Sequence, residues 1–482
     1  MSKTGCRRAS FSINNKHNKK MKTKDLVNLG IPLGAPMDEV KGLIKGFFEA
    51  GETVDTVRSV LEGAVLDPDS YVDHPNASAF ARLIKGKRWI PRESPAPYRQ
   101  WGKDLEPQSV QQMANACQLP IAERGALMPD AHVGYGLPIG GVLATRGAVI
   151  PYAVGVDIAC RMKLSVFDIP LKKLNKDRGR GRFTDAINQE TKFGVGSFFR
   201  DKRHHDVLDA NWRVSPITDQ CKDKAWKQLG TSGSGNHFVE FGEIELFDDS
   251  LGLESGTYMA LMSHSGSRGT GAAVASHYCK LAQQSHPELP KELRHLAWLD
   301  LDSNEGQEYW AAMELMGEYA AANHACIHKH IAENLGAETL LDIENHHNFA
   351  WKEFHDGQDL IVHRKGATPA GEGVLGVIPG SMASPAYVVR GKGEPDSLNS
   401  AAHGAGRVMS RKKAVHNLKW KDAKLMLDQR GVTLLSAGLD EVPFVYKDID
   451  EVMGLQSDLV DSVARFFPKL VKMAPAGERP ED

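Results

Sequence analysis

Five short segments between residues 155 and 407 each place a metal-binding or nucleophilic side chain beside small, turn-forming residues. They are GVDIAC ending at Cys160, SGSGNHFVE around His237, SHSGSRGTG around His264, NHHN around His347 and SAAHGAGR around His403. The glycine and alanine residues beside His403 leave room for a bulky ligand. A lone histidine means little, but five such segments indicate one site, so the fold has to bring distant parts of the chain together.

The composition allows a large core and gives the chain no strong overall charge. Of the 482 residues 41% are hydrophobic, and 59 lysine and arginine residues balance 61 aspartate and glutamate residues. At roughly 150 residues per domain the length suggests about three domains, although one large catalytic body fits equally well. The near-neutral charge argues against a protein that coats nucleic acid but permits a local basic groove. No apolar run approaches about 20 residues, so we expect no membrane span.

Two features bear on the cellular compartment. Residues 1–24 are basic and polar and lack the apolar core of a signal peptide, so we expect a disordered arm, which is better interpreted as a solvated tail than as an RNA contact. The six cysteines show no paired spacing, which favours free thiols in a reducing cytosol, and hence a cytoplasmic protein. They are Cys6, Cys117, Cys160, Cys221, Cys279 and Cys326.

The periodicity changes near residue 90. Residues 25–89 predict a small helical module, with a second helix from Val54 to Leu61 and a stop for the first helix at Gly51. The apolar stripe of the first helix is Val40, Leu43, Ile44, Phe47 and Phe48. The proline-rich stretch at 91–97 predicts a linker into a catalytic body that spans residues 90–482.

The body mixes strand and helix patterns without regular alternation. Met162, Leu164 and Val166 predict a half-buried strand, and the alternation from His237 to Phe241 predicts another. A long helix is predicted from near Glu305 to Leu335. This mixture favours an α+β fold over a doubly wound sheet.

The polar residues of the five segments suit a divalent metal. Asp157 and Cys160 lie three residues apart, and a thiolate can bridge two metals. Thiolate and imidazole alone would suggest zinc or iron, and the carboxylate widens the choice to manganese. Singly, each residue is better explained as a buried cysteine or a core histidine; the shared setting beside glycine, serine or asparagine favours the site. His324 and His328 share a helix face, but HACIH has no acidic residue between them, so we expect a surface or packing role.

Three glycine-rich segments, GTSGSGNH, SHSGSRGTG and VIPGSM, offer backbone N–H groups of the kind that phosphates bind. Each is a weak signal by itself. A Walker A sequence, a G-x-G-x-x-G dinucleotide turn and the K-x-D-G motif of lysine-nucleophile ligases are all absent from the sequence.

Taken together and in order, these segments resemble the tRNA-splicing ligase RtcB family from about Gly125 to the C-terminus. The stretches that carry the resemblance are MPDAHVGYGLPIGGVLAT, PYAVGVDIACRM, GTSGSGNHFVE, SHSGSRGTG, NHHNFAW, HRKGATPA, VIPGSM and AAHGAGRVMSR. The resemblance implies a large mixed-sheet catalytic body of the RtcB type, preceded by the small helical module. It also implies that the protein joins RNA 3′-phosphate or 2′,3′-cyclic phosphate ends to 5′-hydroxyl ends with GTP and two Mn²⁺ ions, in RNA repair or tRNA splicing. An archease is a candidate activating partner, and we expect a monomer.

The resemblance also implies residue roles. The metal ligands are Asp157, Cys160, His237, His264 and His347, with Cys160 bridging, and His403 is the nucleophile that forms a histidine–GMP intermediate. Glu240 reads the guanine edge, and Lys472 is the best match to a contact near the C-terminus. The expected nucleotide contacts are Asn236, His237, Phe238, Val239, Glu240, His347, Asn348, Pro379, Gly380, Ser381, Met382, His403, Gly404, Ala405, Gly406 and Lys472. The chain departs from the family's usual residues at Arg161, commonly glycine, and at Ala386, usually serine.

Two other functions are compatible with parts of this pattern. A metal-dependent RNA-end guanylyltransferase or phosphodiesterase that does not seal would keep the ligands and lack a productive 5′-hydroxyl site. A catalytically dead RNA- or nucleotide-binding protein would have lost ligands or the nucleophile, and all six side chains are present. The ligase is therefore the leading hypothesis.

Overall fold

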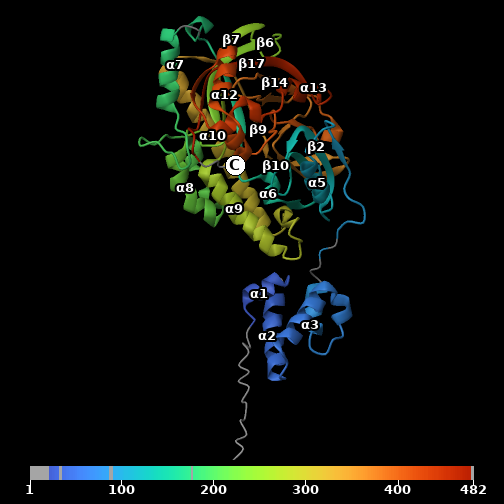
Figure 1. Ribbon diagram of the computed structural model, residues 1–482. Helices are drawn as coiled ribbons and strands as arrows, with labels where there is room; N and C mark the ends of the chain where they lie inside the picture. Colours follow the sequence, from blue (N-terminus) through green and yellow to red (C-terminus); the bar gives the residue numbers. More distant parts are fainter. Residues whose placement is uncertain (1–20, 32–34, 86–88, 90, 175–176, 479–482) are drawn as a thin grey trace, which may run out of the picture. The chain divides into compact units, whose positions relative to one another are not determined.

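The computed structural model describes residues 21–31, 35–85, 89, 91–174 and 177–478. The chain divides into two compact units, Met1–Trp89 with Pro287–Leu289 and Ile90–His286 with Pro290–Asp482 (Figure 1). Most of the arm expected at residues 1–24 lies outside the described residues, and its last two residues, Thr23 and Lys24, begin the first helix.

The described part of the N-terminal unit is helical, as the apolar stripe predicts. Its helices are α1 (Thr23–Asn28), α2 (Ala35–Glu49), α3 (Val54–Leu66) and α4 (Ser78–Lys85), with a 3-10 turn at Pro68–Tyr71. Thr53 caps α3, because its side chain accepts a hydrogen bond from the backbone N–H of Thr56. One face of each helix contributes to a core that includes Leu26, Val40 and Phe80.

A large mixed sheet forms the centre of the body. In the described residues its strands follow the order β13 (Leu375–Ile378), β14 (Ala386–Gly391), β17 (Val460–Met473), β6 (Phe238–Leu246), β7 (Gly256–Ser265), β5 (Arg161–Phe167) and β9 (Thr339–His346), and β16 (Thr433–Ser436) also pairs with β17. The sheet curls until β13 comes back to β9, where Asn345 accepts a hydrogen bond from the backbone N–H of Val377. The concave side is filled by apolar residues such as Met162, Leu164 and Phe466.

A second sheet packs its apolar face toward β13 and β14. Its strands follow the order β1 (Tyr98–Gln100), β2 (Ala122–His132), β3 (Ile139–Thr145), β11 (Gln358–Lys365) and β10 (Asn348–His355). Val142 and Val362 of this sheet share a core with Ile378 and Val389 of the large sheet. Two short pairs, β12 (Ala367–Pro369) with β15 (Ser400–Ala402) and β4 (Ala148–Val149) with β8 (Leu299–Asp300), complete the strands described.

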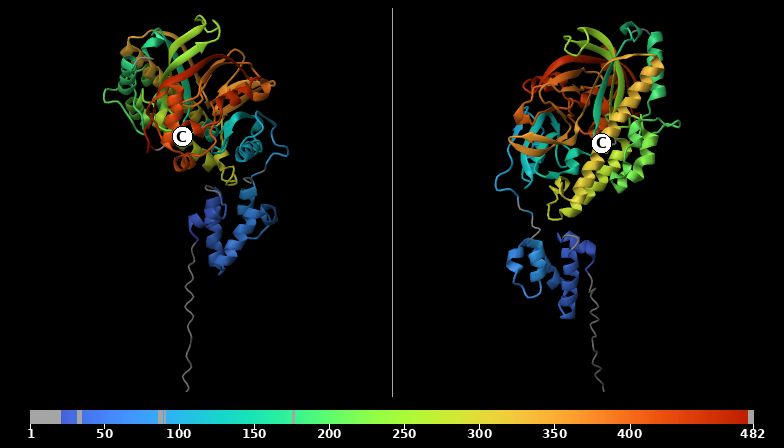
Figure 2. Two further views of the ribbon diagram at one scale, coloured as in Figure 1. Left: turned by 45° about the horizontal axis from the view of Figure 1, so that its top comes forward. Right: turned by 180° about the vertical axis from the view of Figure 1, so that it is seen from behind.

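Helices cover the convex side of the large sheet, and α10 runs along it (Figure 2, right). The helices of the body are α5 (Pro107–Ala116), α6 (Pro151–Val154), α7 (Asp177–Glu190), α8 (Pro216–Gln228), α9 (Arg268–Ser285), α10 (Asn304–Leu335), α11 (Arg411–Asn417), α12 (Trp420–Arg430) and α13 (Ile449–Gly454). Ser303 caps α10 at its start, and Gly336 ends it in the left-handed conformation. Among the described residues, no helix is both long and apolar enough to cross a membrane.

The predicted α+β class is confirmed, and so are the helices around Val40, Val54 and Glu305. The prediction of a half-buried strand at Met162 is wrong in one respect, because every residue of β5 is buried. Its polar side, with Lys163 and Ser165, faces α10 instead of solvent, and hydrogen bonds and ion pairs compensate these buried polar groups.

Candidate active site

A cavity of about 520 Å³ in the body brings the five histidine- and cysteine-bearing segments together. It lies where β6, β7 and β9 meet the loops that precede or follow them. The residues with expected roles that line it are Asp157, Cys160, Asn236, Phe238, Glu240, His264, His347, Asn348, Pro379, Gly380, Ser381, Met382, His403, Gly404, Ala405 and Gly406.

The five candidate metal ligands come from four places in the fold. Asp157 and Cys160 lie in the loop between α6 and β5, where Ala159 has a positive φ of 57°. His237 comes directly before β6, His264 lies in β7, and His347 joins β9 to β10. Because β5 is flanked by β7 on one side and β9 on the other, these strand ends meet at one edge of the sheet.

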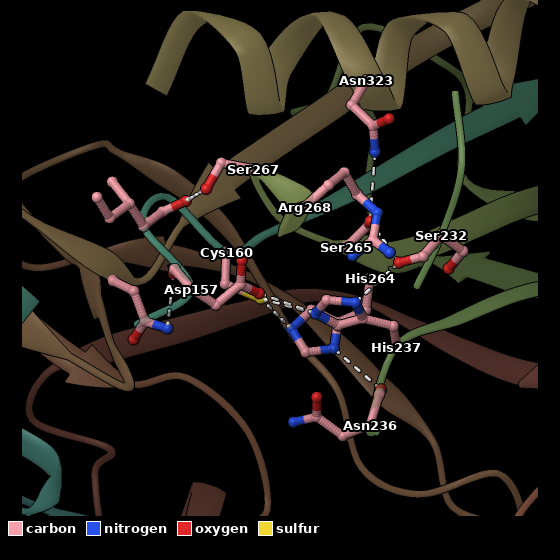
Figure 3. Close-up of polar contacts among 12 residues, drawn as sticks. Asp157, Cys160, Ser232, Asn236, His237, His264, Ser265, Ser267, Arg268 and Asn323 are labelled. Carbon is pink, nitrogen blue, oxygen red and sulfur yellow. Dashed lines mark hydrogen bonds and ion pairs between the residues drawn. The ribbon is translucent and has the colours of Figure 1, made fainter. Parts of the chain in front are cut away.

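The donor atoms of these ligands converge, and Figure 3 shows four of the residues, Asp157, Cys160, His237 and His264. The Cys160 Sγ atom lies 3.1 Å from His264 Nε2 and 3.5 Å from His237 Nε2. His237 Nε2 lies 2.9 Å from an Asp157 carboxylate oxygen, and His264 Nε2 lies 3.2 Å from His347 Nε2. Cys160 therefore contacts two of the three histidines, and Asp157 and His347 contact those histidines in turn.

The hydrogen bonds of the imidazole rings aim unprotonated nitrogens at this centre. His237 Nδ1 donates to the Ser232 carbonyl at 2.8 Å, and His264 Nδ1 donates to the Asn236 carbonyl at 3.1 Å. Neutral rings held this way present Nε2 lone pairs to a carboxylate, a thiolate and a third imidazole. Facing lone pairs repel one another unless a cation lies between them, so this donor set fits a divalent metal.

Burial keeps the imidazoles in their metal-binding form. It lowers the pKa of His264 to about 3 and holds that of His347 well below its ordinary value. For Asp157 burial alone would raise the pKa, but the close contacts of its carboxylate with His237 and Cys160 outweigh burial, so the pKa lies below its usual value. Neutral imidazoles and an ionised carboxylate are the forms that coordinate metals.

Glycine-rich backbone and α10 hold the His237 segment. Gly230, Gly233 and Gly235 have positive φ angles of 80°, 102° and 73°, which a residue with a side chain rarely adopts. The buried Asn323 side chain of α10 accepts from the Gly230 N–H at 2.7 Å and donates to the Thr231 carbonyl at 2.9 Å. Asn323 of α10 therefore fixes the turn that precedes His237.

His403 follows the short strand β15 and lines the same cavity. Its Nδ1 atom lies 2.7 Å from an oxygen of the fully buried Asp130, which also accepts from the His403 backbone N–H at 3.2 Å. The ring centroid lies 4.9 Å from that of His347. Because the carboxylate holds the proton on Nδ1, Nε2 is the nitrogen that can act as a nucleophile.

The residues after His403 are small because the chain passes close to other backbone there. A Cβ atom on Gly406, whose φ is 73°, would lie 2.1 Å from the Asp130 carbonyl oxygen. A Cβ atom on Gly404 would lie 3.3 Å from the carbonyl oxygen of Pro379. The HGAG sequence thus lets the histidine loop lie against both β2 and the VIPGSM loop.

Most of the expected nucleotide contacts line the cavity, and three, Val239, Lys472 and His237, do not. Val239 is fully buried on the opposite side of β6, in the core beneath α7 and α10. Lys472 alternates with Val471 and Met473, which line the cavity, and its ammonium group donates to the Asn188 side chain at 2.8 Å. His237, directly before the start of β6, does not line the cavity but contacts Cys160 and Asp157, which do.

Glu240 is a buried acid without a cationic partner among the described residues. It is 4% exposed and lines the cavity beside Phe238. Burial raises its pKa to about 8, so the side chain is protonated at neutral pH unless a ligand supplies hydrogen-bond donors. Such an acid can recognise donor groups of a bound base.

Three charged residues at the cavity escaped the sequence predictions. Asp130 supports His403 from β2, and the sequence predicted no role for it within the MPDAH segment. Lys365, at the end of β11, lines the cavity and donates to the Tyr152 carbonyl at 2.9 Å, and burial lowers its pKa to about 7. Arg407 also lines the cavity and pairs with Glu441 at 3.3 Å. The available signal for the two basic residues was their nearness to a histidine, because Lys365 follows His363 in HRK and Arg407 ends the HGAGR segment.

Three histidines near these segments, His324, His328 and His346, have structural surroundings. His324 and His328 are buried, and both bond to the Ser263 hydroxyl, at 2.7 and 2.8 Å, so they pack α10 on β7 and do not lie on the surface. His346 points away from the metal ligands and contacts Arg161 at 3.2 Å. Of the two histidines of NHHN, only His347 therefore contacts the other candidate ligands. Arg161 is buried beside Glu344, so its charge is turned toward β9.

Comparison with known proteins finds the same family over most of the body. A family model described as tRNA-splicing ligase RtcB matches residues 112–215 and 203–473. The chain is 34% identical over 399 residues to the RNA-splicing ligase RtcB of Escherichia coli strain K12, which covers 76% of this chain and 95% of that protein. It is 31% identical over 445 residues to the tRNA-splicing ligase RtcB of Thermococcus kodakarensis, covering 76% and 91%. With the tRNA-splicing ligase RtcB of Nanoarchaeum equitans it shares 33% identity over 464 residues, covering 80% and 96%.

Proposed function

Because this chain belongs to the tRNA-splicing ligase RtcB family, we propose that it is a GTP- and Mn²⁺-dependent RNA ligase. It joins RNA 3′-phosphate or 2′,3′-cyclic phosphate ends to 5′-hydroxyl ends through a histidine–GMP intermediate, in RNA repair or tRNA splicing. The observation that carries the proposal is the orientation of His403. Its Nδ1 is held by Asp130 at 2.7 Å, and its ring lies 4.9 Å from that of His347 in the same cavity.

Five side chains would hold two Mn²⁺ ions. Cys160 is the shared ligand, since its sulfur lies within 3.5 Å of both His237 Nε2 and His264 Nε2. His347 and Asp157 extend the donor set on either side. Bound Mn²⁺ spreads the negative charge that builds up on phosphate groups during transfer.

The transfer steps use His403 and the substrate ends. His403 Nε2 forms a bond to the α-phosphorus of GTP, and the bond from that phosphorus to the pyrophosphate oxygen breaks. An oxygen of the RNA 3′-phosphate then takes the GMP group and frees His403. The 5′-hydroxyl oxygen attacks the 3′-phosphorus, GMP leaves, and a phosphodiester results. Asp130 keeps the proton on Nδ1 and stabilises the positive ring during the first step.

The rest of the cavity fits a guanine nucleotide. Phe238 offers an apolar ring, and the Glu240 carboxyl can accept hydrogen bonds from the donor groups of guanine. The loops at 379–382 and 404–406 bring backbone groups to the cavity with little side-chain obstruction. Asn236 and Asn348 line the same wall.

The proposal is tested by incubating the protein with α-labelled GTP and Mn²⁺, followed by a denaturing gel. Wild-type protein should take up an acid-labile label, and His403→Ala should not. His416→Ala, at an exposed histidine of α11, is the matched control and should be labelled like the wild type.

Labelled protein is then mixed with RNA carrying a 3′-phosphate and RNA carrying a 5′-hydroxyl. Joined RNA would support the ligase. Accumulation of RNA capped with GMP at its 3′ end, without joined product, would instead identify a guanylyltransferase that does not seal. Absence of label on wild-type protein with metal bound would refute the histidine–GMP mechanism.

A further inference from the structure

A strongly basic tract leaves the cavity directly after the His403 loop. Between Arg407 and Lys424 the sequence has seven lysine and arginine residues and a single aspartate, Asp422, whereas the whole chain carries a net charge of −2. Residues 408–411 line the cavity, and the next residue begins the run of lysines. The tract is therefore continuous with the site.

The two arginines of this tract are neutralised, and the lysines are not. Arg407 pairs with Glu441, and Arg411 pairs with Asp440 at 3.0 Å and with Glu441. Five lysines on or beside α11 and α12 are exposed, and their ammonium groups form no ion pair within the described residues. We call them the basic face: Lys412, Lys413, Lys419, Lys421 and Lys424.

The fold presents these lysines outward on a fixed support (α12 in Figure 1). Ala414 of α11 and Ala423 of α12 are fully buried against Val442 and Val445. Leu427, one turn further along α12, packs into a neighbouring cluster. Since the small apolar side of each helix faces inward, the charged side has to face solvent.

We propose that the basic face binds the phosphate backbone of the RNA strand whose end occupies the cavity. Clustered cations repel one another, so such a face is favourable chiefly when a polyanion covers it. Neutralisation of backbone phosphates by lysine needs no base-specific geometry, which suits an enzyme that recognises only the strand end in its cavity. The inference rests on the proposed ligase function and adds the path of the strand outside the cavity.

The test compares two triple variants of the full-length chain. Lys412→Gln/Lys413→Gln/Lys421→Gln removes three charges from the basic face. Lys280→Gln/Lys291→Gln/Lys329→Gln removes three exposed charges elsewhere in the body and is the matched control. Binding of a 3′-phosphorylated RNA of about 16 nucleotides and of a 3′-phosphorylated dinucleotide is measured by fluorescence anisotropy over a series of salt concentrations.

For the longer RNA, the slope of log affinity against log salt should fall by about 2 in the first variant, at roughly 0.7 per lost phosphate contact. Its affinity at low salt should fall by about tenfold or more, while dinucleotide binding and GMP labelling of His403 stay at the wild-type level. The control variant should behave as wild type.

Unchanged affinity and slope for the longer RNA would overturn the proposal, and so would an equal loss for the dinucleotide. Phosphatidylserine vesicles that bind the wild type more tightly than RNA does, with binding lost in the first variant, would assign the face to a membrane and also overturn it. If wild-type protein takes up no GMP, the ligase function fails, yet the length-dependent loss of RNA binding would still establish the basic face.

Discussion

At the scale of single residues, the hydrogen bond between Asp130 and His403 decides which ring nitrogen can react. Asp130 is fully buried, so its carboxylate holds the Nδ1 proton in one place. Asp130→Asn keeps the shape but presents an amide that no longer favours the proton on Nδ1. We expect the rate of GMP transfer to His403 to fall by about 10²- to 10⁴-fold, with the thermal midpoint changed far less. Single-turnover labelling with α-labelled GTP measures the rate, and an unchanged rate would contradict this role.

Glu240 makes the stability of the protein depend on pH in a defined direction. Its pKa is raised from the usual 4.5 to about 8, so between these values the folded protein keeps a proton that the unfolded chain releases. The folded state therefore loses stability as the pH rises from about 4.5 to 8, by on the order of 1 kcal/mol per pH unit, and no further above that range. Glu240→Gln should lack this dependence on pH, because its amide side chain does not titrate.

The measurement is the thermal midpoint of wild type and Glu240→Gln from pH 5 to pH 8. The thermal midpoint of Glu240→Gln should rise steadily relative to that of the wild type as the pH increases. Parallel curves for the two proteins would show that Glu240 is ionised in the folded state throughout.

The sequence allowed the prediction of those site residues that have characteristic sequence neighbours. Cys160 and the three metal-site histidines lie beside turn-forming residues, and the structure brings them together. Asp130 was missed, because its partner His403 is 273 residues away and a single aspartate inside an apolar strand carries no local signal. That Lys472 does not line the cavity also has no local signal, since the strand alternation that turns it away depends on where β17 pairs with β6.

At the scale of elements, α10 supports the metal site from behind the sheet. Asn323 accepts from the Gly230 N–H and donates to the Thr231 carbonyl and the Ser265 hydroxyl. Asn323→Ala leaves buried backbone groups without partners, at about 1–3 kcal/mol each. We expect a loss of about 2–4 kcal/mol in the free energy of unfolding, together with weaker Mn²⁺ binding, because the turn carries His237.

The control on the same helix is Asn334→Ala. Asn334 is exposed and bonds only to the side chains of Gln189 and Glu190. Its loss should change stability by no more than about 0.5 kcal/mol and leave Mn²⁺ affinity intact. Electron paramagnetic resonance of free Mn²⁺ gives the affinity, and wild-type affinity in Asn323→Ala would rule out the supporting role.

The extent of α10 was predictable because its apolar period, its serine cap and its terminal glycine are all local features. The burial of β5 was not. Residues Met162 to Val166 alternate between apolar and polar, as expected for a strand with one face exposed to solvent. Ser165 is buried because α10 packs on that face. Tertiary contacts thus decided the environment of a strand whose existence the pattern had indicated.

At the scale of the whole molecule, the candidate metal site connects strands that are distant in the sequence. The ligands come from residues 157 to 347, on three strand ends of the large sheet and the loop before β5. Among the described residues, His347 Nδ1 is buried without a hydrogen-bond partner, and His347 Nε2 lies 3.2 Å from His264 Nε2, so without metal the buried His347 ring is incompletely satisfied. Metal binding should therefore stabilise the entire body and not only the loops at the site.

Removal of metal with a chelator should lower the thermal midpoint of the main unfolding transition by several degrees relative to protein with excess Mn²⁺. At a free concentration about 100 times Kd, one site contributes about 2.7 kcal/mol. His264→Gln should abolish this shift, because Nε2 of His264 contacts both Cys160 and His347. His355→Gln is the matched control, since His355 is a buried histidine that bonds to Glu353 outside the site. If the two variants responded equally to Mn²⁺, the stabilising ion would have to bind elsewhere, because only one of them removes a ligand from the convergent donor set.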